Sequence, residues 1–598
     1  MTNISDCRIP ISNPILQRNK PDSFPNCFIQ DFMPKIYSLL LIVMLTVCNG
    51  RAQDVQSFKG AKPFTIKGNI SAGMWYYGTS GIASRRQPFS WYITGAPVVS
   101  IYGISLPFSM TVSEQERRYA QPFNRYGVSP HYKWITLHAG YRNVRFSDFT
   151  LAGVNMLGGG LEANPGIFRF GVMAGRINRA VSEDTLSGET RSFRTYPVYK
   201  RMAYAFKIGI GKTANFFDLS FFKGYDDYRS IKRPVTNTKV TPMENAVLGF
   251  KTRLKLLKKL TFIADGAVSA LTRNLYASRL DSSSTSETDI KWLKKASGLL
   301  EINSTTGIYS AGRASLSYGF GIGSIAARYE RIGQDFQSLG AFFFNNDNEQ
   351  WTISPSFGLL NNKVSVSGSY GVGRDNLKGK KYATTYRKIG SLNLGWQLSE
   401  KLNIGVNYAN YGTNQNRGTG DLFNDTTAIS IVNSSYGFNA AFTETNTYQV
   451  HSMNLSGGVQ DAKDKNRFTS SLTDVASLYG NLGYSLTAVE TQSTASLNVN
   501  WNKTKTPDYN IMTFGPTVSV SIPFFDKKLR PMVSGTYYLR KTNGQQDGTT
   551  LTFNGNLGYS FGKQTFSMGG NILRNKSNTS LTPTFNEWRG TLTYGYSF

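Results

Sequence analysis

The side chains that most often carry chemistry are scarce in this chain, which has three histidines: His131, His138 and His451. A serine activated by a histidine would support acyl transfer. In an expected strand over 133–142, His138 lies at the alternate positions that form the polar face, together with Thr136 and Arg142. No serine nucleophile motif stands out beside it. We therefore interpret His138 as a polar side chain that faces the inside of the protein, and we expect no enzymatic activity.

Two short motifs suggest ligand binding but lack the rest of a site. Residues 209–213 end like a phosphate-binding loop, yet Phe206 stands where that motif needs its first glycine. Residues 345–349 offer carboxylate and amide oxygens of the kind that calcium prefers, without an ordered ligand spacing. We interpret the first as a hairpin turn and the second as a solvated loop, and we expect neither a cofactor nor a metal ion.

Basic side chains are abundant, with 66 Lys and Arg against 37 Asp and Glu and a formal net charge of +29. They form no long run of the kind found in nucleic-acid-binding tails, so we expect no nucleic-acid partner. Several basic residues instead occupy alternate positions of expected strands, on the face that the apolar residues leave free. A ring of such side chains inside a pore selects anions, and the candidates that face the lumen are Lys207, Lys251, Arg253, Lys255, Arg169 and Arg142.

The elements that must position these side chains are strands. Within 204–211, one parity is apolar and the other holds Ala, Lys and Gly. Similar alternation runs from residue 65 to the end, with Gly, Ser and Asn on the polar face and aromatic residues at the ends of the apolar face. A soluble sandwich would have a core of Val, Ile and Leu instead. The pattern therefore favours an all-β, transmembrane antiparallel barrel.

The connection after 204–211 decides which charges meet across the hairpin. We place a two-residue turn at Lys212 and Thr213, which puts Lys207 opposite Asp218 on the polar face. The hairpin is therefore expected to carry a charge pair inside the barrel.

The stretch 121–176 is the most distinctive, because arginines are dense there and the alternation breaks down at 143–151. One interpretation is that 143–151 leaves the wall, folds into the lumen and narrows it, with Arg and Glu networks that satisfy the buried polar groups. The candidates for this constriction are Arg117, Arg118, Arg125, Arg145 and Glu162. The alternative is an ordinary loop followed by a periplasmic turn at 164–166.

Short turns alternate with long polar stretches, such as 178–201, 276–296 and 411–447. Short periplasmic turns and longer outside loops are typical of barrels in the bacterial outer membrane. We count roughly 24 strands, within a range of about 20–28, which is consistent with one large barrel. No composition break divides this body, so we predict no separate plug domain.

The beginning of the chain resembles an export signal. Residues 33–52 contain Lys35, an apolar run over 36–47 and an ending of small residues, which indicates a secretory signal peptide. In the alternative, Cys48 is the acylated residue of a lipoprotein. We assign 1–32 to sequence upstream of the true start, 53–64 to a short periplasmic segment and 65–598 to the barrel. All three cysteines precede residue 53, so the mature protein would have no disulfide.

The last strand, 588–598, has aromatic residues at alternate positions and ends on Phe598. It resembles the closing strand of bacterial outer-membrane β-barrels, which the barrel-assembly machinery recognises. The residues that this resemblance implies as the signal are Trp588, Tyr594, Tyr596 and Phe598. We expect the strand to close the wall by pairing with the first strand at 65–77, and Phe598 to serve insertion rather than transport.

The mature chain resembles large outer-membrane β-barrel proteins of the Bacteroidetes type, in its Gln-Asp start, its Tyr-, Asn- and Gly-rich strands and its terminal Phe598. The resemblance implies a Gram-negative outer membrane, with lipid, lipopolysaccharide and the barrel-assembly machinery as partners. The chain departs from TonB-dependent transporters, which place a plug domain before the barrel.

We expect a pore or transport channel with a basic lumen, narrowed by inward-folded segments and biased toward anionic or polar solutes. The first alternative is a structural anchor, or an export or assembly partner, that holds another surface or secreted protein in its lumen or on outside loops such as 411–447. The second alternative is an outer-membrane enzyme.

Overall fold

The computed structural model describes residues 63–114, 120–182, 196–231, 240–278, 298–342, 344–419, 423–579 and 582–598. The chain divides into two units, Met1–Lys62 and Pro63–Phe598, and the described residues all belong to the second. The predicted upstream segment 1–32, the signal peptide 33–52 and nearly all of the segment 53–64 lie outside the described residues. Arg117 and Arg118 lie outside them as well.

The first half of the described chain consists of β1 (Phe64–Lys67), β2 (Asn69–Ser80), β3 (Phe89–Gly95), β4 (Val98–Ile101), β5 (Ile104–Ser113), β6 (Arg125–Val128), β7 (His131–Tyr132), β8 (Ile135–Arg142), β9 (Met156–Ala163), β10 (Phe168–Asn178), β11 (Lys200–Lys212), β12 (Asn215–Asp227), β13 (Glu244–Leu256), β14 (Leu260–Thr272) and β15 (Thr306–Phe320). The second half consists of β16 (Gly323–Ile332), β17 (Asn348–Leu359), β18 (Val364–Arg374), β19 (Ala383–Gln397), β20 (Leu402–Arg417), β21 (Ser430–Thr445), β22 (Gln449–Asp464), α4 (Ser470–Thr473), β23 (Val475–Ala488), β24 (Thr494–Lys505), β25 (Asn510–Ser521), β26 (Leu529–Thr542), β27 (Gln545–Phe561), β28 (Gln564–Ser577) and β29 (Phe585–Ser597).

Three pairs of these segments continue each other in one register and act as single wall strands. β1 runs into β2 at Gly68, β3 into β4 at 96–97, and β6 into β7 at 129–130. Pro97 and Pro130 lie at the second and third interruptions, where the missing amide hydrogen breaks the ladder. The 29 segments therefore form 26 wall strands.

The wall closes on itself. β29 pairs with β2 from Asn69↔Ser597 to Ser80↔Asn586, and all of the strand pairings are antiparallel. The predicted antiparallel barrel is confirmed, with 26 strands within the expected range, and so is the predicted pairing of the last strand with the first. No separate plug domain occurs among the described residues.

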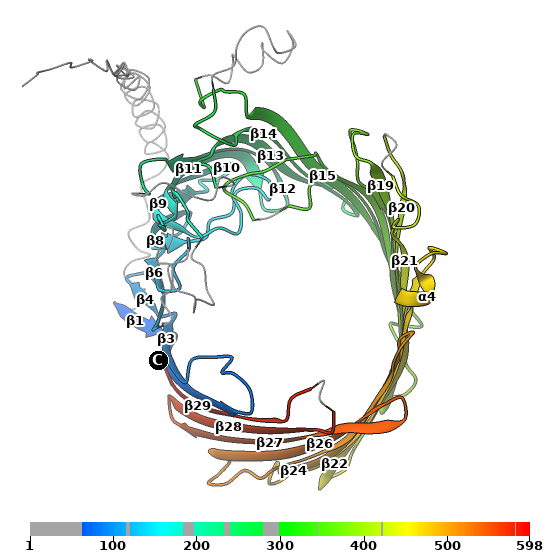
Figure 1. Cartoon of the computed structure of the whole chain (residues 1–598). Helices are drawn as coiled ribbons and strands as arrows, with labels where there is room; N and C mark the ends of the chain where they lie inside the picture. Colours follow the sequence, from blue (N-terminus) through cyan, green and yellow to red (C-terminus); the bar gives the residue numbers. More distant parts are fainter. Residues whose placement is uncertain are drawn as a thin grey trace, which may run out of the picture. The chain divides into compact units, whose positions relative to one another are not determined.

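The two edges of the barrel differ in their connections. One edge has turns such as 102–103, 133–134, 213–214 and 562–563, and both ends of the described chain lie at this edge. The other edge has the longer connections, such as 143–155, 179–199, 273–305 and 333–347. Figure 1 looks along the barrel and shows loops inside the ring of strands. We call the two edges the short-turn edge and the long-loop edge.

The two faces of the wall differ as the alternation predicts. In β11, Tyr204, Phe206 and Ile208 are more than 40% exposed on the outer face, whereas Ala203 and Ala205 are buried on the inner face. The buried apolar residues of the barrel thus lie inside the ring rather than between two sheets. In the described part of the chain, no helix is long and apolar enough to span a membrane.

The predicted charge pair between Lys207 and Asp218 is wrong, because the turn lies one residue later than predicted. The turn of this hairpin is Thr213-Ala214, so Lys212 pairs with Asn215 and Lys207 lies opposite Ser220. A shift of the turn by one residue moves each cross-strand partner by two positions. Both charges find other partners, which are described below.

The predicted long outside loop at 411–447 is also wrong. β20 and β21 occupy most of it, and the connection between them is 418–429. Asn410, Asn414 and Ser434 lie on the outer face of these strands near the long-loop edge. Because both faces carry polar side chains there, the alternation that marks a strand disappears from the sequence.

Candidate functional site

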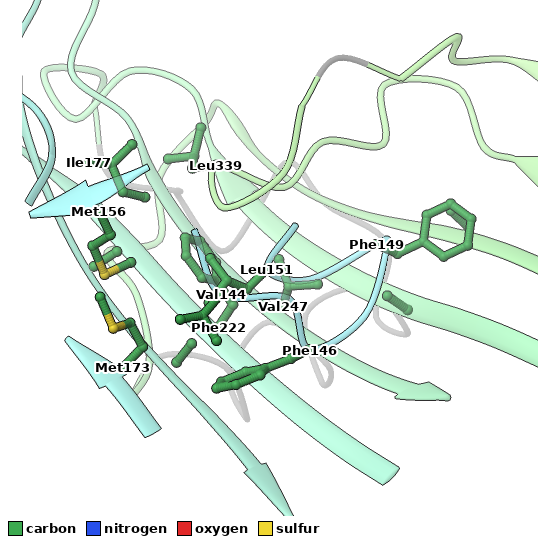
Figure 2. Packing of buried hydrophobic residues seen from close by; sticks show 14 of the residues in the cluster. Val144, Phe146, Phe149, Leu151, Met156, Met173, Ile177, Phe222, Val247 and Leu339 are labelled. Carbon is green, nitrogen blue, oxygen red and sulfur yellow. The ribbon is translucent and has the colours of Figure 1, made fainter. Parts of the chain in front are cut away.

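Two connections leave the wall and lie against its inner face. We call residues 143–155, between β8 and β9, the inward segment, and residues 333–347, between β16 and β17, the inward loop. Phe149 and Leu151 of the inward segment and Phe336 of the inward loop are at most 1% exposed. Figure 2 shows side chains of the inward segment between those of neighbouring wall strands.

An apolar cluster holds the two connections together. The ring of Phe149 packs edge-on against Phe336, with centroids 5.9 Å apart, and stacks on Phe344 at 5.6 Å. The wall contributes both large and small side chains to the cluster. The small ones, which leave room for backbone to approach, are Ala203, Ala205, Val247, Ala267 and Ala311. The backbone also joins the two connections, because the Ala152 amide donates to the Gly340 carbonyl at 2.9 Å.

Glycine at position 249 creates part of this room. A Cβ at Gly249 would lie 2.5 Å from Thr150 Cγ2 and 3.3 Å from the Ala267 Cβ. Gly249→Val should displace the inward segment, at a packing cost of about 1–3 kcal/mol. We expect a higher single-channel conductance in planar bilayers, whereas Gly558→Val, at an inner-face glycine whose nearest neighbour would be 3.9 Å away, should leave conductance unchanged. Equal conductance in both variants would contradict this role for Gly249.

Hydrogen bonds that buried wall residues accept hold both connections in place. Asp265 accepts from Ser147 Oγ at 2.6 Å and from the Asp148 amide at 3.1 Å. Asn245 accepts from the Leu339 amide at 3.0 Å. Buried polar groups are costly unless they are paired, so these anchors specify one position for the segment and the loop.

Asp148 is the centre of an ionic cluster on the inner face. It accepts a hydrogen bond from Arg145 Nε at 2.7 Å, pairs with Arg313 and lies 3.9 Å from Lys251 Nζ. The guanidinium of Arg313 also lies over the ring of Phe149, 5.1 Å from its centroid. Burial raises the pKa of Asp148, but the hydrogen bond from Arg145 and the charges of Lys251 and Arg313 outweigh it and leave the pKa below its usual value.

The lowered pKa of Asp148 gives a pH dependence. A carboxylate whose pKa is depressed on folding stabilises the fold above its unfolded pKa and loses that contribution as the pH falls through the folded pKa. We therefore expect single-channel conductance to stay constant near neutral pH and to rise only below about pH 4. Asp148→Asn should show the raised conductance at neutral pH. A wild-type transition between pH 6 and 8 would rule out this origin.

The other predicted lumen-facing basic residues lie on the inner face, several of them in ion pairs. Arg169 binds Asp218 through two nitrogens at 2.7 and 3.0 Å and stacks on Phe216. Lys207 donates to Glu162 at 3.0 Å beneath the ring of Phe146. Arg142 donates to Ser109 Oγ and to the Pro107 carbonyl, both at 2.9 Å. Arg253 and Lys255 share the inner parity of Lys251 and are exposed.

The predicted constriction residues do not form one group. Arg145 and Glu162 bind to Asp148 and Lys207, as described above. Arg125 donates from Nε to the Pro122 carbonyl at 2.8 Å and lines a cavity of about 420 Å³ between the inward segment, the inward loop and β10–β11. Gln121, Asn155 and Gln337 line the same cavity.

Much of the inner face of the later strands is polar and uncharged, although Arg540 of β26 pairs with Asp547 there. Its side chains bond to one another across neighbouring strands, as in Asn481 to Asn500 at 2.7 Å, Ser496 to Ser519 at 2.6 Å and Thr517 to Thr536 at 3.0 Å. The larger charged clusters therefore lie on the side of the ring that carries the inward segment, and the opposite side, called the neutral side below, presents mainly hydroxyl and amide groups.

Ser129 is a partner of His138 that was not predicted from the sequence. Ser129 Oγ lies 2.9 Å from His138 Nδ1, and Glu162 Oε2 lies 3.4 Å from His138 Nε2. The two residues are cross-strand neighbours on β6–β7 and β8, so a correct register would have revealed them. The interpretation of 345–349 as solvated is wrong for Asp347, which is 4% exposed and accepts from the amides of Asn376 and Leu377.

The predicted assembly residues lie at the seam of the barrel. Trp588 and Tyr596 are exposed on the outer face of β29, and Tyr594 lies 4.8 Å from Phe566 between ring centroids. The Phe598 amide donates to the Gly68 carbonyl at 3.0 Å, and the Gly68 amide donates to the Phe598 carbonyl at 3.2 Å. Phe598 thus extends the pairing of the last strand with the first.

The chain matches no family model and no curated protein. Solved structures with a similar fold include the P pilus usher (PapC) translocation pore, with a TM-score of 0.34 and 11% identity over 89% of this chain and 99% of that one. OccAB4 of Acinetobacter baumannii has a TM-score of 0.29 and 12% identity over 66% and 98%. The siderophore receptor PirA from Pseudomonas aeruginosa has a TM-score of 0.37 and 9% identity over 89% and 80%.

Proposed function

We propose that the protein is an outer-membrane pore or transport channel whose lumen is narrowed on one side by the inward segment and the inward loop. The observation that carries this proposal is their burial against the inner face of β10–β15, which among the described residues fills one side of a 26-strand ring. A barrel of this size needs either filling or an open channel. The apolar outer face supports a membrane location.

The charge of the narrowed side supports a preference for anionic or polar solutes. Lys251, Arg253, Lys255, Arg313 and Arg145 lie there, and Asp148, Asp265 and Glu330 offset part of their charge. Basic residues in a pore attract anions. The neutral opposite side would hydrogen-bond to hydroxyl and amide groups of a passing solute.

Liposome swelling tests this proposal. Liposomes that hold the purified protein should swell in small neutral polar solutes, and faster in an anionic solute than in a cationic solute of the same size. Swelling no faster than that of empty liposomes would contradict the pore.

One observation supports the alternative of an anchor or export partner. The described residues leave the neutral side of the ring uncovered. A protein partner could occupy that side. Under this alternative, protein recovered in mild detergent would carry a stoichiometric partner and would conduct only after the partner is removed. Conduction by partner-free protein as isolated favours the pore.

We propose that the Ser129, His138 and Glu162 chain is structural rather than catalytic. The Ser129 amide donates to the Pro107 carbonyl at 3.0 Å and the Leu137 amide to the Pro130 carbonyl at 2.8 Å, so these donors belong to the ladder and are not directed at an oxyanion. Ester hydrolysis by the purified protein should not exceed that of Ser129→Ala. Hydrolysis that this substitution abolishes would overturn the assignment.

A further inference from the structure

A row of basic side chains lies on the outer face of the wall near the long-loop edge. It occupies alternate strands, β22, β24, β26 and β28, and shares the parity of the exposed apolar residues on those strands. We call this row the outer basic belt, and it consists of Lys463, Lys503, Lys505, Lys541, Arg574 and Lys576. Outer-face charges contact whatever surrounds the barrel, so they have no role in lining the lumen.

The register places the belt just beyond an aromatic row. Trp501 pairs with Phe514 on the outer face, and two residues further toward the long-loop edge Lys503 pairs with Met512, which pairs with Lys541. On β28, Arg574 follows Ile572, the partner of Trp588, by two residues. Aromatic rows of membrane barrels rest at the interface. Two residues of strand add up to about 7 Å, which brings the belt to the depth of lipid headgroups.

The belt forms no ion pair in the part of the chain that the structure describes. Among the described residues, none of its six side chains forms an ion pair or a side-chain hydrogen bond, and Asp461 is the one carboxylate on the same face of β22, β24, β26 and β28. Several inner-face charges differ in this respect, because Arg169, Lys207 and Arg540 each bind a carboxylate. The belt therefore presents uncompensated positive charge to its surroundings.

An apolar groove also lies on the outer face, further from the long-loop edge than the belt. It has a volume of about 590 Å³ and is lined by Phe438, Leu455, Leu482 and Trp501, among others. Gly457 and Gly480 pair with each other at its floor, and Gly480 pairs in turn with Trp501. The groove therefore lies next to the strand position from which Lys503 and Lys505 continue toward the long-loop edge.

We propose that the outer basic belt binds the phosphate groups of anionic lipids in the outer leaflet, with an acyl chain of one such lipid in the groove beneath Lys503. Alternate strands are about 9–10 Å apart, so neighbouring belt residues would reach separate phosphates or the two ends of a bisphosphorylated headgroup. Lysine suits this role as a point charge for phosphate. The inference rests on the membrane location proposed above, and not on conduction through the lumen.

Lipid retention tests the belt. The full-length protein would be purified, delipidated in detergent and mixed with lipid A, a phosphorylated glycolipid, or with phosphatidylcholine, and native mass spectrometry would count the bound copies. One variant carries glutamine at all six belt positions. The control variant loses six basic residues at exposed positions in the short turns: Lys258, Lys259, Lys363, Lys527, Lys528 and Lys563.

We expect the wild type and the control to retain severalfold more lipid A than phosphatidylcholine, and the belt variant to retain both equally. Equal lipid A retention in the belt variant and the control would overturn the proposal. If inorganic phosphate displaced lipid A at the same phosphate concentration, the belt would bind free phosphate rather than a lipid headgroup, and the proposal of a lipid site would be overturned. A heat-induced gel shift confirms that each variant is folded. We expect the belt variant to conduct as the wild type does, so that loss of lipid binding can be told apart from loss of the pore.

Discussion

Replacement of 143–151 by a short Gly-Ser link is expected to raise the single-channel conductance severalfold. The replaced residues include the buried Phe149 and Leu151 and the ion-paired Asp148. Without Phe149 the inward loop loses the packing partner of Phe336 and Phe344, and without Asp148 the wall residues Lys251 and Arg313 lose their carboxylate. Both connections would then leave the inner face of β10–β15, and the narrowed side of the lumen would widen.

The barrel itself should survive this replacement, because its closure depends on the ladders between wall strands and not on the inward segment. The β2 and β29 seam lies away from the replaced residues in the ring. A matched control replaces the same number of residues in the 465–474 connection, which lies on the neutral side, and should leave conductance unchanged. Unaltered conductance in the 143–151 variant would show that the inward segment does not limit the pore.

Deletion of Phe598 is the second change with a large expected effect, and it should lower the amount of assembled barrel severalfold. The deletion removes both hydrogen bonds between Phe598 and Gly68 and the ring that lies 5.7 Å from Tyr596. It also removes the terminal aromatic residue that we expect the barrel-assembly machinery to recognise. Molecules that do insert should conduct as the wild type does, since Phe598 lies at the short-turn edge.

Phe561→Ala is the matched control for this deletion. Phe561 is an outer-face aromatic residue at the short-turn edge, 59% exposed, but it lies at the end of β27 rather than at the chain terminus. We expect normal assembly of this variant in outer-membrane fractions, and near-normal assembly of Phe598→Tyr. If Phe561→Ala and the deletion lowered the amount of assembled barrel equally, the loss of any outer-face aromatic side chain at this edge, and not the terminal position, would account for the effect.

The barrel was predictable because its two faces meet different surroundings. Residues such as Tyr204, Phe206 and Ile208 alternate with small or polar residues, and this period of two fixes both the strand and its outer face. The last strand was predictable for the same reason. Where both faces meet water, as at Asn410 and Asn414, the period disappears and β20 and β21 could not be followed to their ends.

The partners of the charges were less predictable, since they depend on register. Lys207 and Asp218 were identified as inner-face residues, but a turn displaced by one residue gave them the wrong partners. Loss of alternation at 143–151 suggested an inward segment as one of two interpretations, and the inward loop was not predicted from the sequence. A signal did exist, because Phe336, Leu339 and Phe344 are large apolar residues in a connection at the long-loop edge, where exposure to water would be unfavourable.

The outer basic belt was not predicted from the sequence. Lys503 and Lys505 follow Trp501 on the same parity, so the sequence already places them on the lipid side beyond an aromatic anchor. Their alignment with Lys541 and with the residues of β28 required the pairing of four more strands.

The reversal potential of single channels tests the central claim most directly. The purified wild-type protein would be inserted into a planar bilayer of phosphatidylcholine with a tenfold KCl gradient across it. We expect discrete, stable conductance steps and a reversal potential of the sign that chloride selectivity gives, reduced when Lys251, Arg253 and Lys255 are replaced by glutamine. Folded protein that inserts without any conductance, or a reversal potential of the opposite sign, would contradict the account.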